Sequence, residues 1–418
     1  MACGARRTAR WGHQGWFALL LGAGIALPGT GLALDPMPIN QDGPVRVVPT
    51  LGVGYGYDDN VEQAPDDQAS GRQVVRLTPT LSVLARERAN VYRLVYSPEL
   101  FLFRGDRYGN RVNHNAAAIG EVVFNARNRA SVNLQANRNE SPLSDTNRAN
   151  DESDGDINER VILDGSYLFG AQNARGQLRF SAGHIWNRYA NNLLEEGSNK
   201  QSEEYDSPFA GATFLMRVAP KTRGFAEVSY QDYRYIWSQS TLDSYNVNAS
   251  LGLSWEATAK TTGEFRLGRE RKSFDDAAKS DQTITSWQAE IRWEPTTYST
   301  VDLATSSSLG EGSESADNTT RESTIEARSY SVDWTYAWNN RFSTSLGYRR
   351  LEEDYIASAG RNAGRVDRTN DVNFGVTYSF RRWLDVGVTA TMRDKDASVG
   401  PESSYKQNVY FLVLEASL

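Results

Sequence analysis

Polar and apolar residues alternate with a period of two from residue 45 of this chain almost to its end. Because successive side chains of a strand point to opposite faces, this period predicts strands and not helices. The segment 330–338 shows the pattern well, with one aromatic face and one small, polar face. Its two faces read Tyr330, Val332, Trp334, Tyr336, Trp338 and Ser331, Asp333, Thr335, Ala337.

The lengths of the connections separate two kinds of all-β fold that share this alternation, the soluble sandwich and the membrane barrel. Short connections, such as 125–129 and 339–341, alternate along the chain with long hydrophilic ones, such as 58–71 and 139–158. Outer-membrane barrels have short periplasmic turns and long external loops. The sequence therefore predicts a transmembrane antiparallel up-and-down β-barrel over residues 45–418.

The strand count follows from the same segmentation and is about eighteen, an even number, which leaves both ends of the barrel in the periplasm. Aromatic residues at the short-turn ends of strands predict one of the two interfacial girdles. The expected strands are 45–57, 73–85, 91–103, 112–124, 130–138, 159–168, 177–189, 205–218, 224–237, 244–256, 263–274, 282–294, 300–308, 322–338, 342–352, 368–380, 384–393 and 405–418. The girdle residues are Phe124, Phe169, Trp255, Trp293, Trp338, Phe380 and Trp383.

The first 33 residues predict a secretory signal peptide that is removed on export. Three arginines precede the apolar run 16–27, and small residues follow it. That run is roughly a dozen residues long, short of the roughly 20 that a membrane-spanning helix needs. Residues 34–44 then form a short periplasmic segment before the barrel, and the bacterial outer membrane is the expected location.

Charge and cysteine content exclude several classes of function. Loss of residues 1–33 removes three arginines and no acid, which changes the formal net charge from -7 to -10. Such an acidic chain is not expected to bind nucleic acid. Cys3 is the one cysteine and lies before the apolar run, so the exported chain is expected to have no disulfide, Cys-ligated metal or cysteine nucleophile.

Catalytic, metal and cofactor sites are not expected either. Beyond the leader only His114 and His184 could act as imidazole bases, and both are interpreted as polar wall residues. The run Asp154-x-Asp156-x-Asn158 opens like a calcium loop, but Glu159 stands where such a loop needs glycine. Gly52, Gly54 and Gly56 recur on one strand face without a following helix, so they indicate a small-residue stripe inside the barrel and not a nucleotide loop.

The polar face of the strands predicts the wall of a wet pore. It mixes both signs of charge with neutral amides, so a constriction of a single sign is not evident. Merely solvating the lumen is an equally good account of these residues. The predicted lumen-lining residues are Asn133, Gln135, Asp164, Asn248, Asp333, Arg349, Asn373, Asp385 and Arg393.

The first strand, read with its flanks over 49–61, and the hairpin 376–384 resemble a family of outer-membrane β-barrel porins often encoded with exopolysaccharide synthesis and export genes. The resemblance covers nearly all of the exported chain and defines no catalytic residue. It implies a role in exporting an exopolysaccharide or capsular polysaccharide across the outer membrane. The partners expected are outer-membrane lipids and lipopolysaccharide, the barrel assembly machinery, periplasmic polysaccharide-export proteins and the polysaccharide itself.

Two other functions remain open at this point. The first is passive diffusion of small solutes through a porin. The second is a structural or adhesive role at the cell surface, carried by the acidic external loops. No cofactor is expected for any of the three.

Overall fold

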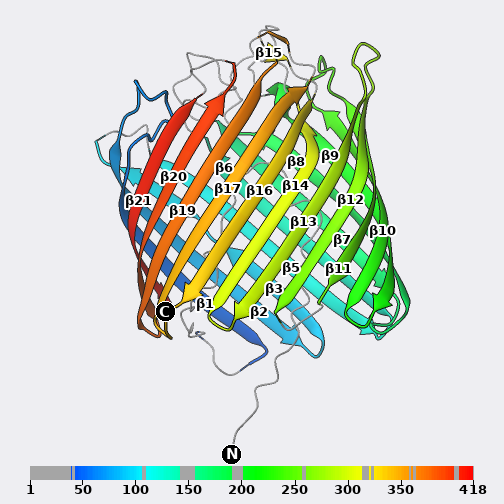
Figure 1. Cartoon of the computed structure of the whole chain (residues 1–418), viewed down its shortest axis with the longest axis horizontal. Helices are drawn as coiled ribbons and strands as arrows, with labels where there is room; N and C mark the ends of the chain where they lie inside the picture. Colours follow the sequence, from blue (N-terminus) through cyan, green and yellow to red (C-terminus); the bar gives the residue numbers. More distant parts are fainter. Residues whose placement is uncertain are drawn as a thin grey trace, which may run out of the picture.

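The computed structural model describes residues 39, 43–105, 110–141, 156–190, 201–256, 260–312, 320–321, 324–356, 359–360, 364–399 and 404–417. Within these residues nineteen strands form one sheet that closes on itself, as Figure 1 shows. No described helix is long and apolar enough to span a membrane. The strands are β1 (Val45–Asp58), β2 (Arg72–Glu87), β3 (Asn90–Tyr96), β4 (Glu99–Phe103), β5 (Arg111–Asn125), β6 (Asn128–Glu140), β7 (Ile157–Phe169), β8 (Gly176–Tyr189), β9 (Tyr205–Ala219), β10 (Thr222–Tyr235), β11 (Ser244–Trp255), β12 (Thr261–Phe274), β13 (Gln282–Thr296), β14 (Ser299–Glu311), β16 (Thr324–Ala337), β17 (Phe342–Ile356), β19 (Val366–Arg381), β20 (Leu384–Ala397) and β21 (Tyr405–Ser417).

Each strand pairs with its neighbours in antiparallel order, and the ring is completed by β1 against β21, from Thr50–Ser417 to Asp58–Val409. Strands β3 and β4 lie one after the other between β2 and β5. They share one place in the wall, so the nineteen described strands fill eighteen positions around the barrel. The predicted fold class, an antiparallel transmembrane barrel of eighteen strands, is confirmed.

The expectation of one continuous strand over 91–103 was wrong. Pro98 follows Ser97 between β3 and β4. Because proline has no backbone N–H to donate, it interrupts the hydrogen-bonded ladder. The structure also contains a small pairing that the alternation did not predict, between β15 (Thr320–Arg321) and β18 (Ala359–Gly360), and a short 3-10 helix, η2 (Gln201–Glu203).

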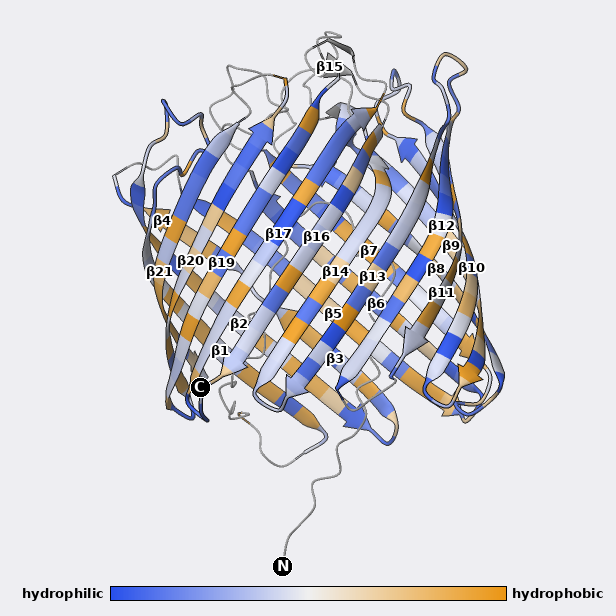
Figure 2. Ribbon diagram, in the orientation of Figure 1, coloured by the Kyte–Doolittle hydropathy of each residue, from blue (hydrophilic) through white to orange (hydrophobic). Residues whose placement is uncertain are grey.

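The outer surface carries a band of exposed apolar side chains. Leu251 is 68% exposed and Phe124 is 64% exposed, which a soluble sheet would not tolerate as part of a continuous band. The predicted girdle residues lie at the short-turn ends of their strands, and all except the half-buried Trp255 are exposed. In Figure 2 the strand ends nearest the long loops are the most hydrophilic part of the wall.

Those hydrophilic ends carry outward-facing ion pairs. Arg138 contacts Glu159 at 3.0 Å, and Arg188 contacts Asp206 at 2.7 Å. Charged groups on the lipid-facing side of a barrel are costly at mid-membrane and tolerated beyond it. Since most strands here have 12 to 16 residues and about 9–11 suffice to cross the bilayer, their loop-side ends extend beyond the hydrocarbon.

The seam between the first and last strands is packed on its inner side around Phe411. Its ring lies over the stripe of Gly54 and Gly56, where a Cβ added to Gly56 would approach Phe411 Cδ1 to 2.6 Å. The guanidinium of Arg76 covers the ring at 4.6 Å from its centroid. The glycine stripe therefore makes room for an aromatic side chain at the closure.

The long-loop end of the seam is fastened by buried polar groups. The amide of Gln407 on β21 donates to both carboxylate oxygens of Asp58 on β1, at 3.0 and 2.9 Å. Asn60, which is fully buried, donates from Nδ2 to the carbonyl of Lys406 at 2.9 Å. The first external loop thus connects the two ends of the barrel through hydrogen bonds that are shielded from water.

Replacing Gly56 with valine tests this packing. The added side chain must displace the Phe411 ring or the β21 backbone, and overpacking of this kind costs about 1–3 kcal/mol. We expect a lower unfolding temperature. It is measured on gels in which the folded and the heat-unfolded barrel migrate at different positions, from the temperature at which the folded band disappears. Gly120→Ala is the control, because its Cβ would meet only Tyr92 at an ordinary 3.5 Å. Equal stability of the two variants would contradict the account of the seam.

Candidate functional site: the inner wall

The register places all nine predicted lumen residues on the strand face opposite the exposed apolar band, which is the concave face of the closed barrel. Some of them contact one another or their neighbours there. Asn133 donates to Asp164 at 3.0 Å, and Arg393 donates to both carboxylate oxygens of Asp371 at 2.7 and 3.1 Å. A role in lining a conducting pore remains a prediction for these residues.

Charge on this inner face is divided between two arcs of the barrel. Along β1 to β10 eleven inward-facing arginines accompany five acids. Along β12 to β21 eleven acids that face inward by register, besides Glu311 at the end of β14, accompany six bases. The first set is Arg46, Arg72, Arg76, Arg86, Arg93, Arg111, Arg129, Arg160, Arg179, Arg217, Arg223 with Asp58, Glu99, Glu121, Asp164, Glu227. The second is Glu264, Glu270, Glu290, Glu294, Asp302, Asp333, Glu353, Asp367, Asp371, Asp385, Glu415 with Arg266, Lys272, Arg292, Arg349, Arg393, Lys395.

The two arcs face each other because each is a continuous run of strands around a closed ring. In Figure 1 the yellow-to-red strands form the near wall, and the blue-to-green strands form most of the far wall. Ion pairs within an arc neutralise part of its charge. Arg292, for example, donates to both oxygens of Asp302 at 2.6 and 3.0 Å. The excess that remains is positive on one wall and negative on the other.

The inner face is not polar throughout, which differs from the expectation of a polar wall. Near the long-loop end, a buried apolar cluster lies on the inner side of β7 to β10. Leu242, from the connection between β10 and β11, is fully buried in it. The cluster consists of Ile162, Ile185, Tyr205, Phe209, Tyr233, Tyr235 and Leu242, with Phe274 against it. The sequence pattern did not show it, because tyrosine and phenylalanine also occupy the outer face.

The end of β14 bends over this cluster. Its pairing with β13 stops at Ser307, and Glu311 reaches the inner face of β10 and β12. There Glu311 accepts from Lys272 Nζ at 2.6 Å and from the hydroxyl of Tyr235 at 2.8 Å. Lys272 has no exposed surface, so the pair is shielded from water. These groups narrow the barrel from one side at its external end.

The two histidines lie on the outer face and do not face the lumen. His114 Nδ1 lies 2.9 Å from the hydroxyl of Tyr96, and His184 packs against Trp186 with ring centroids 4.4 Å apart. The calcium-like run begins at Asp154, which lies outside the described residues. Within the described ranges, no three His, Cys, Asp or Glu side chains converge as metal ligands would.

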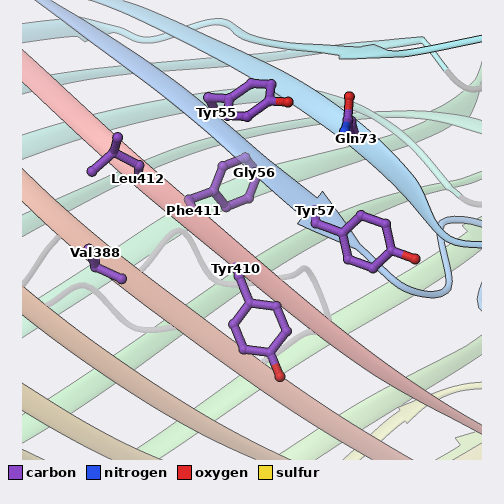
Figure 3. A pocket seen from close by; sticks show the side chains of 8 residues that line it. All are labelled: Tyr55, Gly56, Tyr57, Gln73, Val388, Tyr410, Phe411 and Leu412. Atoms are coloured by element: carbon purple, nitrogen blue, oxygen red, sulfur yellow. The ribbon is translucent and has the colours of Figure 1, made fainter.

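A shallow pocket lies at the seam on the outer side of the wall, shown in Figure 3. Tyr55 and Tyr57 of β1 and Tyr410 of β21 surround it, with Gly56 between them. The three tyrosines belong to the exposed, lipid-facing set. The pocket is therefore part of the membrane-facing surface and is not connected with the charged arcs.

Comparison with protein families agrees with the class described above. An antiparallel barrel with an apolar outer band and a charged inner face defines the class of outer-membrane β-barrel proteins. Residues 42–417 match the family described as putative beta-barrel porin 2, and the chain belongs to that family. A search of curated proteins found no significant match.

Solved structures similar to this chain include three proteins of Pseudomonas aeruginosa. OccK2 (OpdF) is 12% identical with a TM-score of 0.46, and the match covers 89% of this chain and 98% of that one. OpdK is 13% identical with a TM-score of 0.45, covering 89% and 98%. OccK11 (OpdR) is 12% identical with a TM-score of 0.44, covering 89% and 96%.

The buried pair of Lys272 and Glu311 can be tested against its immediate neighbour. Breaking a buried pair by removing one partner costs about 3–5 kcal/mol, because a charge is left uncompensated. We expect Lys272→Gln to lower the free energy of unfolding by an amount of this order, measured by urea titration of tryptophan fluorescence in lipid vesicles.

Arg271→Gln is the matched control, since Arg271 is 63% exposed on the outer face and pairs with Asp281 at 2.7 Å. Exposed pairs contribute about 0–1 kcal/mol. The double variant Lys272→Gln/Glu311→Gln should recover part of the loss. Similar losses for Lys272→Gln and Arg271→Gln would show that the inner pair does not hold β14 in place.

Proposed function

We propose that this protein is a passive outer-membrane channel for small hydrophilic solutes. The observation that carries the proposal is the inner wall, where a predominantly basic arc faces a predominantly acidic one. Barrels with 16–18 strands leave room for an aqueous channel. Charged side chains on the concave face are stable only if water or a polar solute occupies the space between them. A wet lumen with opposite charges on its two walls suits small polar and zwitterionic molecules.

Movement through such a channel follows the concentration gradient and needs no covalent step. A dipolar solute aligns with its negative group toward β1 to β10 and its positive group toward β12 to β21, which compensates for part of its lost hydration. The apolar cluster and the end of β14 narrow the path at the external end. They exclude wide solutes at that end.

Polysaccharide export, which the family resemblance implied, has no separate support among the described contacts. The inner face of β5 to β8 carries several neutral amides, among them Asn115, Asn137 and Asn158, but the same strands also carry inward arginines such as Arg129 and Arg160. Diffusion of small solutes accounts for the paired arcs without a second protein. The export and surface-adhesion functions therefore remain expectations from the sequence.

Conductance in planar bilayers tests the channel directly. We expect purified full-length protein to produce stable steps in potassium chloride, and vesicles containing it to swell in amino acids and monosaccharides faster than in oligosaccharides. Swelling should slow with solute size because the narrowing at β14 limits the width of the path. Vesicles that swell no faster than protein-free ones, together with absent conductance, would rule out an open channel.

Ion selectivity tests the contribution of the basic arc. Arg129 and Arg179 lie on the inner face of β6 and β8, each opposite Leu168 of β7. We expect Arg129→Gln/Arg179→Gln to shift the reversal potential in a salt gradient toward cation preference. A change of one kT in local potential alters the concentration of a monovalent ion about 2.7-fold, and fields in such channels amount to several kT.

The matched control is Arg138→Gln, which removes a charge from the outer face of the same strand β6. It should leave the reversal potential close to that of the unmodified protein. An equal shift in both variants would indicate a general effect of net charge. If the reversal potential of the double variant does not shift, the conducting path does not run along β6 and β8.

A further inference from the structure

Exposed cations collect at the short-turn end of the barrel, in turns that carry little acid. Glu256 is the one acidic residue in the described parts of these turns. Lys260 shares the turn of Glu256 and donates to the carbonyl of Pro295 at 2.8 Å. The other six cations, here called the basic collar, come from six different turns: Arg88, Arg127, Arg175, Lys221, Arg341 and Arg382. All six are exposed, and among the described residues none of their side chains has an acidic partner within ion-pair distance.

At the opposite end of the barrel, several cations on the outer face are paired with acids. Arg188, for example, pairs with Asp206 at 2.7 Å, and Arg350 pairs with Glu352 at 2.5 Å. The described external loop 59–71 contains four acids and no base, and the loop 275–281 contains three acids and one base. Among the described residues, unpaired cations therefore gather at the short-turn, periplasmic end, although single ones such as Arg104 and Lys406 lie at the long-loop end.

The collar borders the aromatic girdle. Arg341 follows Trp338 in one turn, and Arg382 lies beside Trp383 in another. Trp338 is 58% exposed and Trp383 is 47% exposed. Aromatic rings of this kind sit at the level of lipid head groups. The neighbouring guanidinium groups therefore lie at the depth of the phosphates of the periplasmic leaflet.

We propose that the basic collar binds the head groups of anionic phospholipids in the periplasmic leaflet. Guanidinium groups donate two parallel hydrogen bonds to a phosphate, and each basic residue near an anionic surface contributes about 1 kcal/mol. The six cations are distributed over turns from β2–β3 to β19–β20. This spacing fits many small ligands around the rim better than one protein docked on one side. The proposal is independent of what passes through the lumen.

Reconstitution in defined lipid tests the collar. The full-length protein is placed in vesicles of phosphatidylcholine alone or with added phosphatidylglycerol, and its thermal unfolding is followed by tryptophan fluorescence. We expect phosphatidylglycerol to raise the unfolding temperature at low salt. The rise should be lost in 1 M salt, where the screening length falls to about 3 Å.

Variants locate the effect. Arg127→Gln/Arg341→Gln/Arg382→Gln should lose about half of the rise caused by phosphatidylglycerol, since half of the collar is removed. The corresponding Arg→Lys triple variant should keep most of it, which separates charge from packing. Arg138→Gln/Arg188→Gln/Arg350→Gln removes three arginines from the external end and should keep the full rise.

Two results would overturn the proposal. One is an unmodified protein whose unfolding temperature does not respond to phosphatidylglycerol. The collar would then be a surface for a periplasmic macromolecule and not for lipid. The other is an equal loss in the two glutamine triple variants, which would reflect net charge and not the collar.

Discussion

Hydrogen bonding between β1 and β21 is the interaction on which the rest of this structure depends. In hydrocarbon a strand edge has no water to satisfy its N–H and C=O groups, so a sheet can cross the membrane only if its first and last strands pair. Here that pairing runs from Thr50–Ser417 to Asp58–Val409. It is supported inside by Phe411 over Gly54 and Gly56, and at its external end by Gln407 and Asp58. Each of these contacts joins residues more than 340 positions apart in the chain.

Closure also places the charges of the inner face opposite one another. A charge on an open sheet would face water whatever its neighbours, but a ring of strands sets every inward charge opposite another. The arginines of β1 to β10 and the acids of β12 to β21 are separated along the sequence, and the ring turns this separation into two facing walls. The proposed selectivity for small polar and dipolar solutes follows from that geometry and from no single residue.

The ends of the barrel differ in a second way, along its axis. At the external end strands extend beyond the hydrocarbon, and their outward arginines pair with acids such as Glu159 and Asp206. At the periplasmic end the turns are only as long as needed to reverse direction, and their cations stay exposed beside the aromatic girdle. The membrane thus meets paired outward arginines near one rim and exposed turn cations at the other, which is the basis of the proposed lipid contact.

The sequence by itself determined the elements and their direction, because a period of two and the alternation of short and long connections are local properties. It predicted Val45 and Tyr405 as strand starts, placed Phe124 and Trp338 at the girdle, and put Asn133 and Asp164 on one face. Local patterns do not show, however, which distant residues contact each other. Only the tertiary structure showed the break at Pro98, the inward turn of Glu311 onto Lys272, the outward placement of His184, and the division of the inner wall into opposite charges. These depend on which distant strands meet, and that is decided when the ring closes.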